Sequence, residues 1–119
     1  MPKILVVEDD GDLRFLYNQI LSRGGYEVAT ANNTSDGILL LTTEDYDLII
    51  LDMNMPDIPG IRLLEFVRDD VRLRQVPVLV ISANEHWKHR TMELGVQHFM
   101  VKPLQMQQLL DRVELLLAT

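Results

Sequence analysis

Side chains that can carry charge or donate a proton follow four of the five short apolar segments of this 119-residue chain. Three consecutive acids at 8–10 follow the first segment, Asp52 follows the third, Ser82 the fourth and Lys102 the fifth. If these segments are parallel strands of one sheet, their carboxyl ends meet at one edge, where open α/β sheets bind ligands. We therefore expect these side chains to face a common site.

The residue types at this edge indicate chemistry with a divalent cation and a phosphoryl group. Crowded carboxylates raise one another's pKa unless a cation joins them. A hard cation with oxygen ligands meets that demand, and Mg²⁺ that keeps several waters fits well. A carboxylate beside Mg²⁺, a hydroxyl and an ammonium group suits phosphoryl transfer. The carboxylate attacks, the cations neutralise the equatorial oxygens and the hydroxyl donates a hydrogen bond.

Each of these residues also has an ordinary structural role to weigh against the chemical one. Asp10 is equally suited to cap the helix that follows it, and Asp52 could be a turn residue ahead of Pro56. Ser82 taken alone suits a helix cap, and Lys102 taken alone suits a solvated surface position. The coincidence of all four at one edge favours a shared site.

Two hydrophobic periods alternate along the chain and predict five strand–helix units. Apolar strand-like runs lie at 4–7, 27–31, 48–51, 78–81 and 98–101, and helical patterns lie within 13–21, 38–41, 63–67, 85–94 and 106–117. Three runs are continuously apolar, which is typical of parallel strands that helices cover on both faces. Right-handed crossovers then give a three-layer, doubly wound (βα)5 sandwich of class α/β. The pattern does not set the strand order, but the most polar run, 27–31, is expected at an edge.

The composition bounds the class of protein. Eleven Lys and Arg against eighteen Asp and Glu give a net charge of −7, which argues against direct binding to nucleic acid or anionic lipid. No apolar run approaches the roughly 18–20 residues that a membrane helix needs. The absence of cysteine excludes disulfides and thiolate chemistry. We expect one cytoplasmic domain that fills 1–119.

Four motifs in this order resemble the receiver domain of response regulators in two-component signal transduction, the chemotaxis regulator among them. The motifs are Ile4-Leu5-Val6-Val7-Glu8-Asp9-Asp10, Ile49-Ile50-Leu51-Asp52-Met53-Asn54-Met55-Pro56 with Gly60, Ile81-Ser82-Ala83, and Phe99-Met100-Val101-Lys102-Pro103. The resemblance covers essentially the whole chain. It implies a flavodoxin-like sheet with strand order 2-1-3-4-5, which the residues alone do not indicate.

The resemblance implies a phosphoacceptor and a set of metal ligands. Asp52 would take a phosphoryl group from a phosphohistidine of a sensor histidine kinase or a histidine phosphotransfer protein. Mg²⁺ would be the cofactor. Asp9 and Asp52 would bind it directly, Glu8 through water, and Asn54 through its backbone carbonyl. Asn54 and Asn84 also occupy the positions where the family tunes the lifetime of the acyl phosphate.

The resemblance also implies a conformational switch. Ser82 would move toward the new phosphoryl group, Lys102 would pair with it, and Phe99 would rotate inward, with ordinary core packing as the alternative for Phe99. The Lys102–Pro103 peptide bond is expected to be cis. The change would reach a downstream protein through the face formed by the fourth helix, fifth strand and fifth helix. His86, Trp87 and His89, with the basic residues between and after them, are either a partner-facing surface or local packing.

Several functions compete with a phosphorylated signalling module that is not itself an enzyme. A phosphatase of the haloacid dehalogenase type also uses Asp, Lys and Mg²⁺. That family carries an Asp-x-Asp motif after its first strand, whereas this chain carries Asp-x-Asn after the third apolar run. A flavodoxin-like mononucleotide binder would need a Ser-, Thr- or Gly-rich loop where 8–10 is acidic. A receiver used only for docking would not need all of these residues. A stand-alone regulator, a relay shuttle and a domain of a longer protein all remain open.

Overall fold

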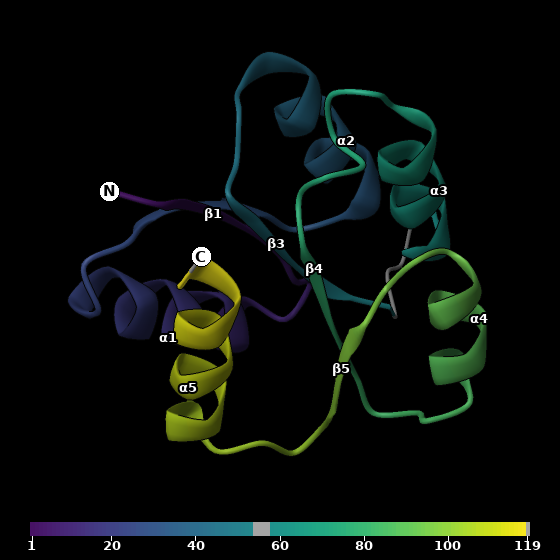
Figure 1. Ribbon diagram of the computed structural model, residues 1–119. Coiled ribbons are helices and arrows are strands. Elements are labelled where there is room, and N and C mark those ends of the chain that lie inside the picture. The colour runs from purple at the N-terminus through teal and green to yellow at the C-terminus, as the bar shows by residue number, and fades with distance from the viewer. Residues whose placement is uncertain (54–57, 119) are drawn as a thin grey trace.

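Strands and helices alternate five times along the chain (Figure 1). The computed structural model describes residues 1–53 and 58–118. The strands are β1 (Lys3–Val7), β2 (Glu27–Ala31), β3 (Leu48–Asp52), β4 (Val78–Ser82) and β5 (His98–Val101). The helices are α1 (Gly11–Arg23), α2 (Thr34–Thr43), α3 (Ile61–Asp69), α4 (Trp87–Glu93) and α5 (Met106–Leu117).

The five strands form one parallel sheet in the order β2-β1-β3-β4-β5. This confirms the order that the resemblance implies and places the polar strand β2 at an edge, as its composition predicts. The register aligns the carboxyl ends: Val7 lies opposite Leu51, and Asp52 lies opposite Ile81. The residues that follow β1, β3, β4 and β5 therefore start from the same edge.

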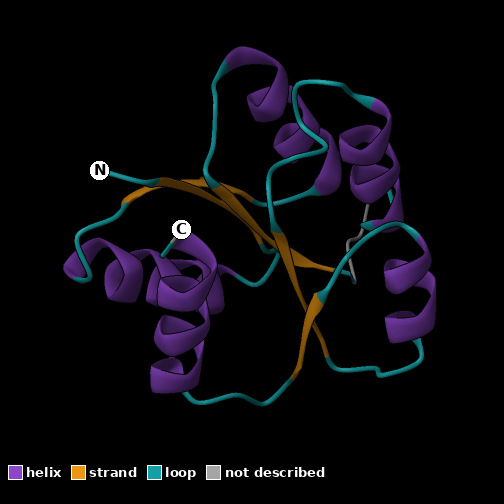
Figure 2. Cartoon of the chain, viewed as in Figure 1, coloured by secondary structure: helices purple, strands orange, loops and turns teal. Residues whose placement is uncertain are grey.

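Helices cover both faces of the sheet, so the three-layer prediction is confirmed (Figure 2). Successive side chains of a strand point to opposite faces. Ile4 and Val6 of β1 accordingly pack with α1 and α5, while Leu5 and Val7 pack with α2 and α3. All five residues of β3 and of β4 are buried. Burial on both faces explains why these strands show no polar alternation.

Local sequence signals define several helix ends. The Asp10 carboxylate accepts the backbone N–H groups of Asp12 and Leu13 at 2.9 and 3.0 Å and so caps α1. Gly25 and Gly95 have φ angles of 93° and 92°, a region that glycine adopts without a steric penalty. These glycines turn the chain into β2 and, through a short loop, toward β5.

Two local details refine the expected pattern. Helix α4 begins at Trp87, two residues after the expected start near Glu85, because residues 85 and 86 form a turn and no side chain caps the helix start. Leu16 belongs to the apolar stripe of α1, yet it is 38 % exposed. The stripe is therefore wider than the surface that α1 buries.

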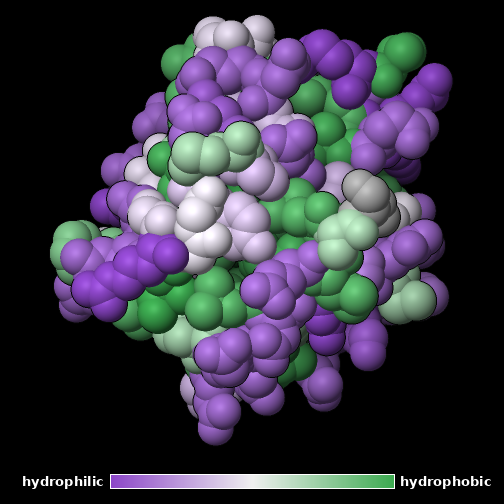
Figure 3. All heavy atoms as spheres, turned by 60° about the vertical axis from the view of Figure 1, so that its left-hand side comes forward, coloured by the Kyte–Doolittle hydropathy of each residue, from purple (hydrophilic) through white to green (hydrophobic). Residues whose placement is uncertain are grey.

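On the face shown in Figure 3, hydrophilic side chains predominate and the apolar groups form separate patches. Exposed large apolar side chains include Phe15, Leu39 and Leu115. Across the described ranges, no helix is both long enough and apolar enough to span a bilayer.

Candidate functional site

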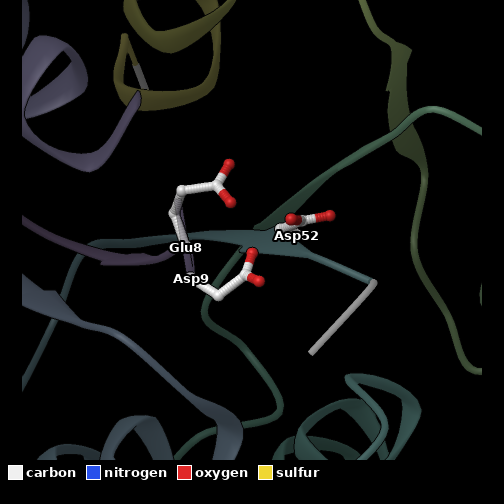
Figure 4. A group of neighbouring side chains, drawn as sticks. All are labelled: Glu8, Asp9 and Asp52. Atoms are coloured by element: carbon white, nitrogen blue, oxygen red, sulfur yellow. The ribbon is translucent and has the colours of Figure 1, made fainter. Parts of the chain in front are cut away.

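Three carboxylates meet at the carboxyl edge of the sheet (Figure 4). Glu8 and Asp9 are the first residues after β1, and Asp52 is the last residue of β3, the strand beside β1. One oxygen from each of the three lies within 4.8 Å of the others. Glu8 and Asp52 are 1 % and 5 % exposed, whereas Asp9 is exposed. The cluster is thus buried on one side and open to solvent beside Asp9.

Lys102, which directly follows the edge strand β5, reaches the same cluster. Its Nζ lies 3.1 Å from Oε1 of Glu8 and 3.3 Å from Oδ2 of Asp52. Its backbone N–H donates to the carbonyl of Ser82 at 2.9 Å, which anchors the residue beside the end of β4. The Lys102–Pro103 peptide bond is cis, the conformation that the resemblance implies. Lys102 is therefore a partly buried partner of two acids and not a solvated surface lysine.

The ionisation of the cluster follows from burial and charge. Burial and the neighbouring Asp52 carboxylate raise the pKa of Glu8 to about 7, against the opposing effect of Lys102. Burial alone would lower the pKa of Lys102, but Asp52 and Glu8 outweigh it and the pKa is raised. The Lys102 ammonium contacts Glu8 and Asp52, and Asp9 adds a third carboxylate to the cluster. The site carries an excess of negative charge that a cation would neutralise.

The donor set fits a hard divalent cation. Glu8, Asp9 and Asp52 offer carboxylate oxygens within a span that one ion can bridge, and solvent can reach it at Asp9. Mg²⁺ prefers such oxygen ligands and keeps several waters. Asn54, expected to contribute its backbone carbonyl and to tune the acyl-phosphate lifetime, lies outside the described residues.

The expected switch residues lie near this edge in two different settings. Ser82 is fully buried, and its hydroxyl accepts the backbone N–H of Asn84 at 3.1 Å. Asn84 is exposed. Phe99 is half-buried and packs against the apolar cluster on the α2–α3–α4 face. Ser82 thus ends the strand next to β3, whereas Phe99 belongs to β5 and to the packed interior.

The basic segment 86–90 combines local packing with exposed charge. Trp87 is half-buried against the core, and its ring centroid lies 5.2 Å from that of His86. Arg90 lies 3.7 Å from Glu65 of α3, and His89 lies 3.9 Å from Glu93. Lys88 is exposed. The packing alternative therefore describes Trp87, while the charged side chains stay at the surface.

Arg14 contacts the acidic loop, a contact that the motif analysis missed. Its Nη1 donates to the backbone carbonyls of Glu8 and Asp9 at 2.9 and 3.3 Å. The available signal was a cation one helical turn beyond Asp10, on the helix that follows the acids. Sequence spacing suggests a partner for an acid at that position. The spacing alone does not predict that the guanidinium donates to backbone carbonyls and not to a carboxylate.

The fold and the acidic edge together define a class of protein. The sequence model of the response regulator receiver domain matches residues 4–114, nearly the full chain. The chain therefore belongs to the response regulator receiver family.

Individual relatives agree with this assignment. The chain is 34 % identical over 116 residues to the transcriptional regulatory protein GltR of Pseudomonas aeruginosa, covering 96 % of this chain and 48 % of GltR. It is 32 % identical to the chemotaxis protein CheY of the same organism, covering 94 % of this chain and 93 % of CheY. The crystallised chemotaxis regulator CheY4 of Vibrio cholerae superposes with a TM-score of 0.91 at 27 % identity, covering 98 % of each chain. The chain thus spans about half the length of GltR and nearly all of CheY.

Proposed function

We propose that this chain, as one receiver domain over 1–119, accepts a phosphoryl group on Asp52 and changes its binding surface in response. The observation that carries the proposal is the position of Lys102, whose ammonium lies 3.3 Å from the Asp52 carboxylate inside a buried acidic cluster. An ammonium group beside one nucleophilic carboxylate can neutralise the charge of an incoming phosphoryl group. The membership in the receiver family supports the same reading.

The donor in this proposal is a phosphohistidine on a sensor histidine kinase or a histidine phosphotransfer protein. An oxygen of Asp52 attacks phosphorus as the P–N bond breaks, and the donor imidazole, protonated from solvent on its other ring nitrogen, leaves as a neutral base. Asp9, Asp52 and Glu8 would hold Mg²⁺ here, and the bound ion would supply charge neutralisation for the phosphoryl oxygens. Lys102 exchanges its contact with Glu8 for a contact with the phosphoryl group. The product is an acyl phosphate on Asp52.

The conformational response is proposed to start at Ser82. A phosphoryl group brings about −1.5 to −2 charges and strong acceptor oxygens to the cleft. The Ser82 hydroxyl can donate to it after rotating away from its contact with Asn84. That movement shifts the loop between β4 and α4, and Phe99 follows. The face formed by α4, β5 and α5 then changes its affinity for a downstream protein. Asn84 is exposed two residues beyond Ser82, and in this proposal its side chain orients a hydrolytic water.

Acyl phosphate formation is tested by mass spectrometry of the intact protein. With Mg²⁺ and a small phosphodonor such as acetyl phosphate, the wild type should gain one phosphoryl group and Asp52→Asn none. The matched control is Asp111→Asn, which removes an exposed carboxylate of α5 and should be phosphorylated like the wild type. Phosphorylation that persists in Asp52→Asn would contradict the assignment. Many turnovers of a generic phosphomonoester would instead favour a phosphatase.

A further inference from the structure

We propose that Arg14 is a positioning residue for the magnesium site, holding Glu8 and Asp9 in place through their backbone carbonyls. The inference deepens the proposed function and rests on it. Arg14 lies in the first turns of α1, and its Nη1 donates to the carbonyls of Glu8 at 2.9 Å and Asp9 at 3.3 Å. One guanidinium therefore ties down two successive residues of the loop that supplies two of the three acids.

The partners of Arg14 are informative because they are backbone carbonyls, although acidic side chains lie nearby. Asp10, Asp12 and Asp36 are all exposed and near in the fold or the sequence. Among the ion pairs of the described residues, none involves Arg14. A surface arginine that served only to balance charge would pair with a carboxylate. Arg14 instead directs its donors to the backbone beneath the metal ligands.

The remaining contacts of the loop leave Asp9 dependent on Arg14. The Asp10 carboxylate caps α1, and the Asp10 N–H donates to Oε2 of Glu8 at 3.3 Å. The Glu8 N–H donates to the Ala31 carbonyl at 3.0 Å. The two residues that flank Asp9, Glu8 and Asp10, are thus each held by hydrogen bonds other than those of Arg14. Asp9 is exposed, and the hydrogen bond described for it is the one that its carbonyl accepts from Arg14. The orientation of Asp9, the solvent-facing ligand, relies on that donor.

The charge of Arg14 and its hydrogen bonds predict opposite changes in Mg²⁺ affinity when the residue is replaced, so the two roles can be distinguished. A positive charge near a cation site repels Mg²⁺, so its removal alone would tighten binding. Loss of the two carbonyl contacts would loosen the ligands and weaken binding. Groups that orient metal ligands from outside the coordination sphere typically contribute about 10- to 100-fold in affinity. Because Arg14 acts on the backbone and not on a ligating carboxylate, we expect the lower end of that range.

The experiment compares Mg²⁺ affinity, measured by isothermal titration calorimetry, in the wild type and three variants. Arg14→Lys keeps the charge, but its side chain is one atom shorter and should leave the ammonium short of the two carbonyls, so the Kd should rise about 10-fold. Arg14→Met also removes the charge and should raise the Kd by a smaller factor. The matched control, Arg23→Met, removes an exposed charge from the last turn of the same helix and should leave the Kd unchanged or slightly lower.

The outcomes separate this inference from the proposed function. A wild type that binds no Mg²⁺ would overturn the magnesium site itself. If the wild type binds Mg²⁺ but Arg14→Lys has the same Kd, or Arg14→Met binds more tightly, the positioning role is wrong. Circular dichroism in EDTA checks the fold of each variant. Loss of the folded state in both Arg14 variants would also overturn the inference, because Arg14 would then be a requirement of the fold.

Discussion

Lys102 organises the acidic cleft at the scale of single residues. Its ammonium lies between the carboxylates of Glu8 and Asp52, two acids that are almost fully buried. Without a cation, carboxylates at this depth would repel each other and favour a shared proton. Burial and, after it, the neighbouring Asp52 carboxylate raise the pKa of Glu8 against the opposing effect of Lys102. A second cation in the cleft would further stabilise the ionised carboxylates.

The raised pKa of Glu8 predicts how stability depends on pH in the absence of Mg²⁺. Folding raises this pKa from 4.5 to about 7, so the native state binds the proton more tightly than the unfolded state. The resulting stabilisation is complete below the unfolded pKa and is lost as the pH rises through about 7. We expect on the order of 2 kcal/mol of unfolding free energy to disappear over this window in EDTA.

Urea denaturation at a series of pH values measures this effect. In Glu8→Gln, the decline in stability between these two pKa values should be much smaller than in the wild type. The control is Glu114→Gln, which removes an exposed carboxylate of α5 and should retain the wild-type dependence. A Glu8→Gln protein that declines as steeply as the wild type would show that another group is responsible.

The ends of secondary-structure elements determine which residues meet, and this explains what could be predicted from the sequence. The apolar runs ending before Glu8 and at Leu51 reveal buried strands, and parallel pairing makes their following acids neighbours. The start of α4 lies two residues beyond its expected position, because no capping side chain marks it. The role of Arg14 could not be foreseen because its partners are backbone carbonyls, whose directions depend on how the loop turns.

The contact between the start of α3 and the end of β3 gives a prediction at the scale of elements. A Cβ atom at Gly60 would lie 3.0 Å from the Asp52 carbonyl oxygen and 3.1 Å from Cα of Met53. Backbone atoms cannot move aside as a flexible side chain can. Gly60→Ala should therefore cost about 1–3 kcal/mol of unfolding free energy and should slow phosphorylation by displacing Asp52.

Gly11→Ala is the matched control for Gly60→Ala. A Cβ at Gly11 would have its nearest contact at 3.8 Å, an ordinary van der Waals distance. Urea denaturation gives the stability of both variants, and the rate of mass gain with acetyl phosphate gives the reactivity of Asp52. Wild-type stability and rate in Gly60→Ala would mean that α3 can shift without disturbing the end of β3.

The whole molecule combines a net charge of −7 with an acidic cleft on one edge of the sheet. The interior on both faces of the sheet follows from the hydrophobic pattern, because three central strands can be buried only between two helical layers. The order of those strands does not follow from it, since β1, β3 and β4 are almost equally apolar. The resemblance to receiver domains supplied that order.

Binding of Mg²⁺ should stabilise the whole fold, because the acids meet only in the native sheet. At a magnesium concentration ten times the Kd, linkage predicts a gain of about 1.4 kcal/mol in unfolding free energy. Asp9→Asn removes one ligand and should lose most of this gain. Asp111→Asn, which alters net charge equally, should keep it. Equal stabilisation of all three proteins by Mg²⁺ would indicate general screening of the acidic surface.

A crystal structure with Mg²⁺ and beryllofluoride, a mimic of a carboxylate-bound phosphoryl group, tests the central claim most directly. We predict beryllium bonded to a carboxylate oxygen of Asp52, with Mg²⁺ between that group and Asp9. Lys102 Nζ should have left Glu8 to contact a fluorine atom. An adduct on any other residue, or a Lys102 that still bridges Glu8 and an unmodified Asp52, would contradict the account.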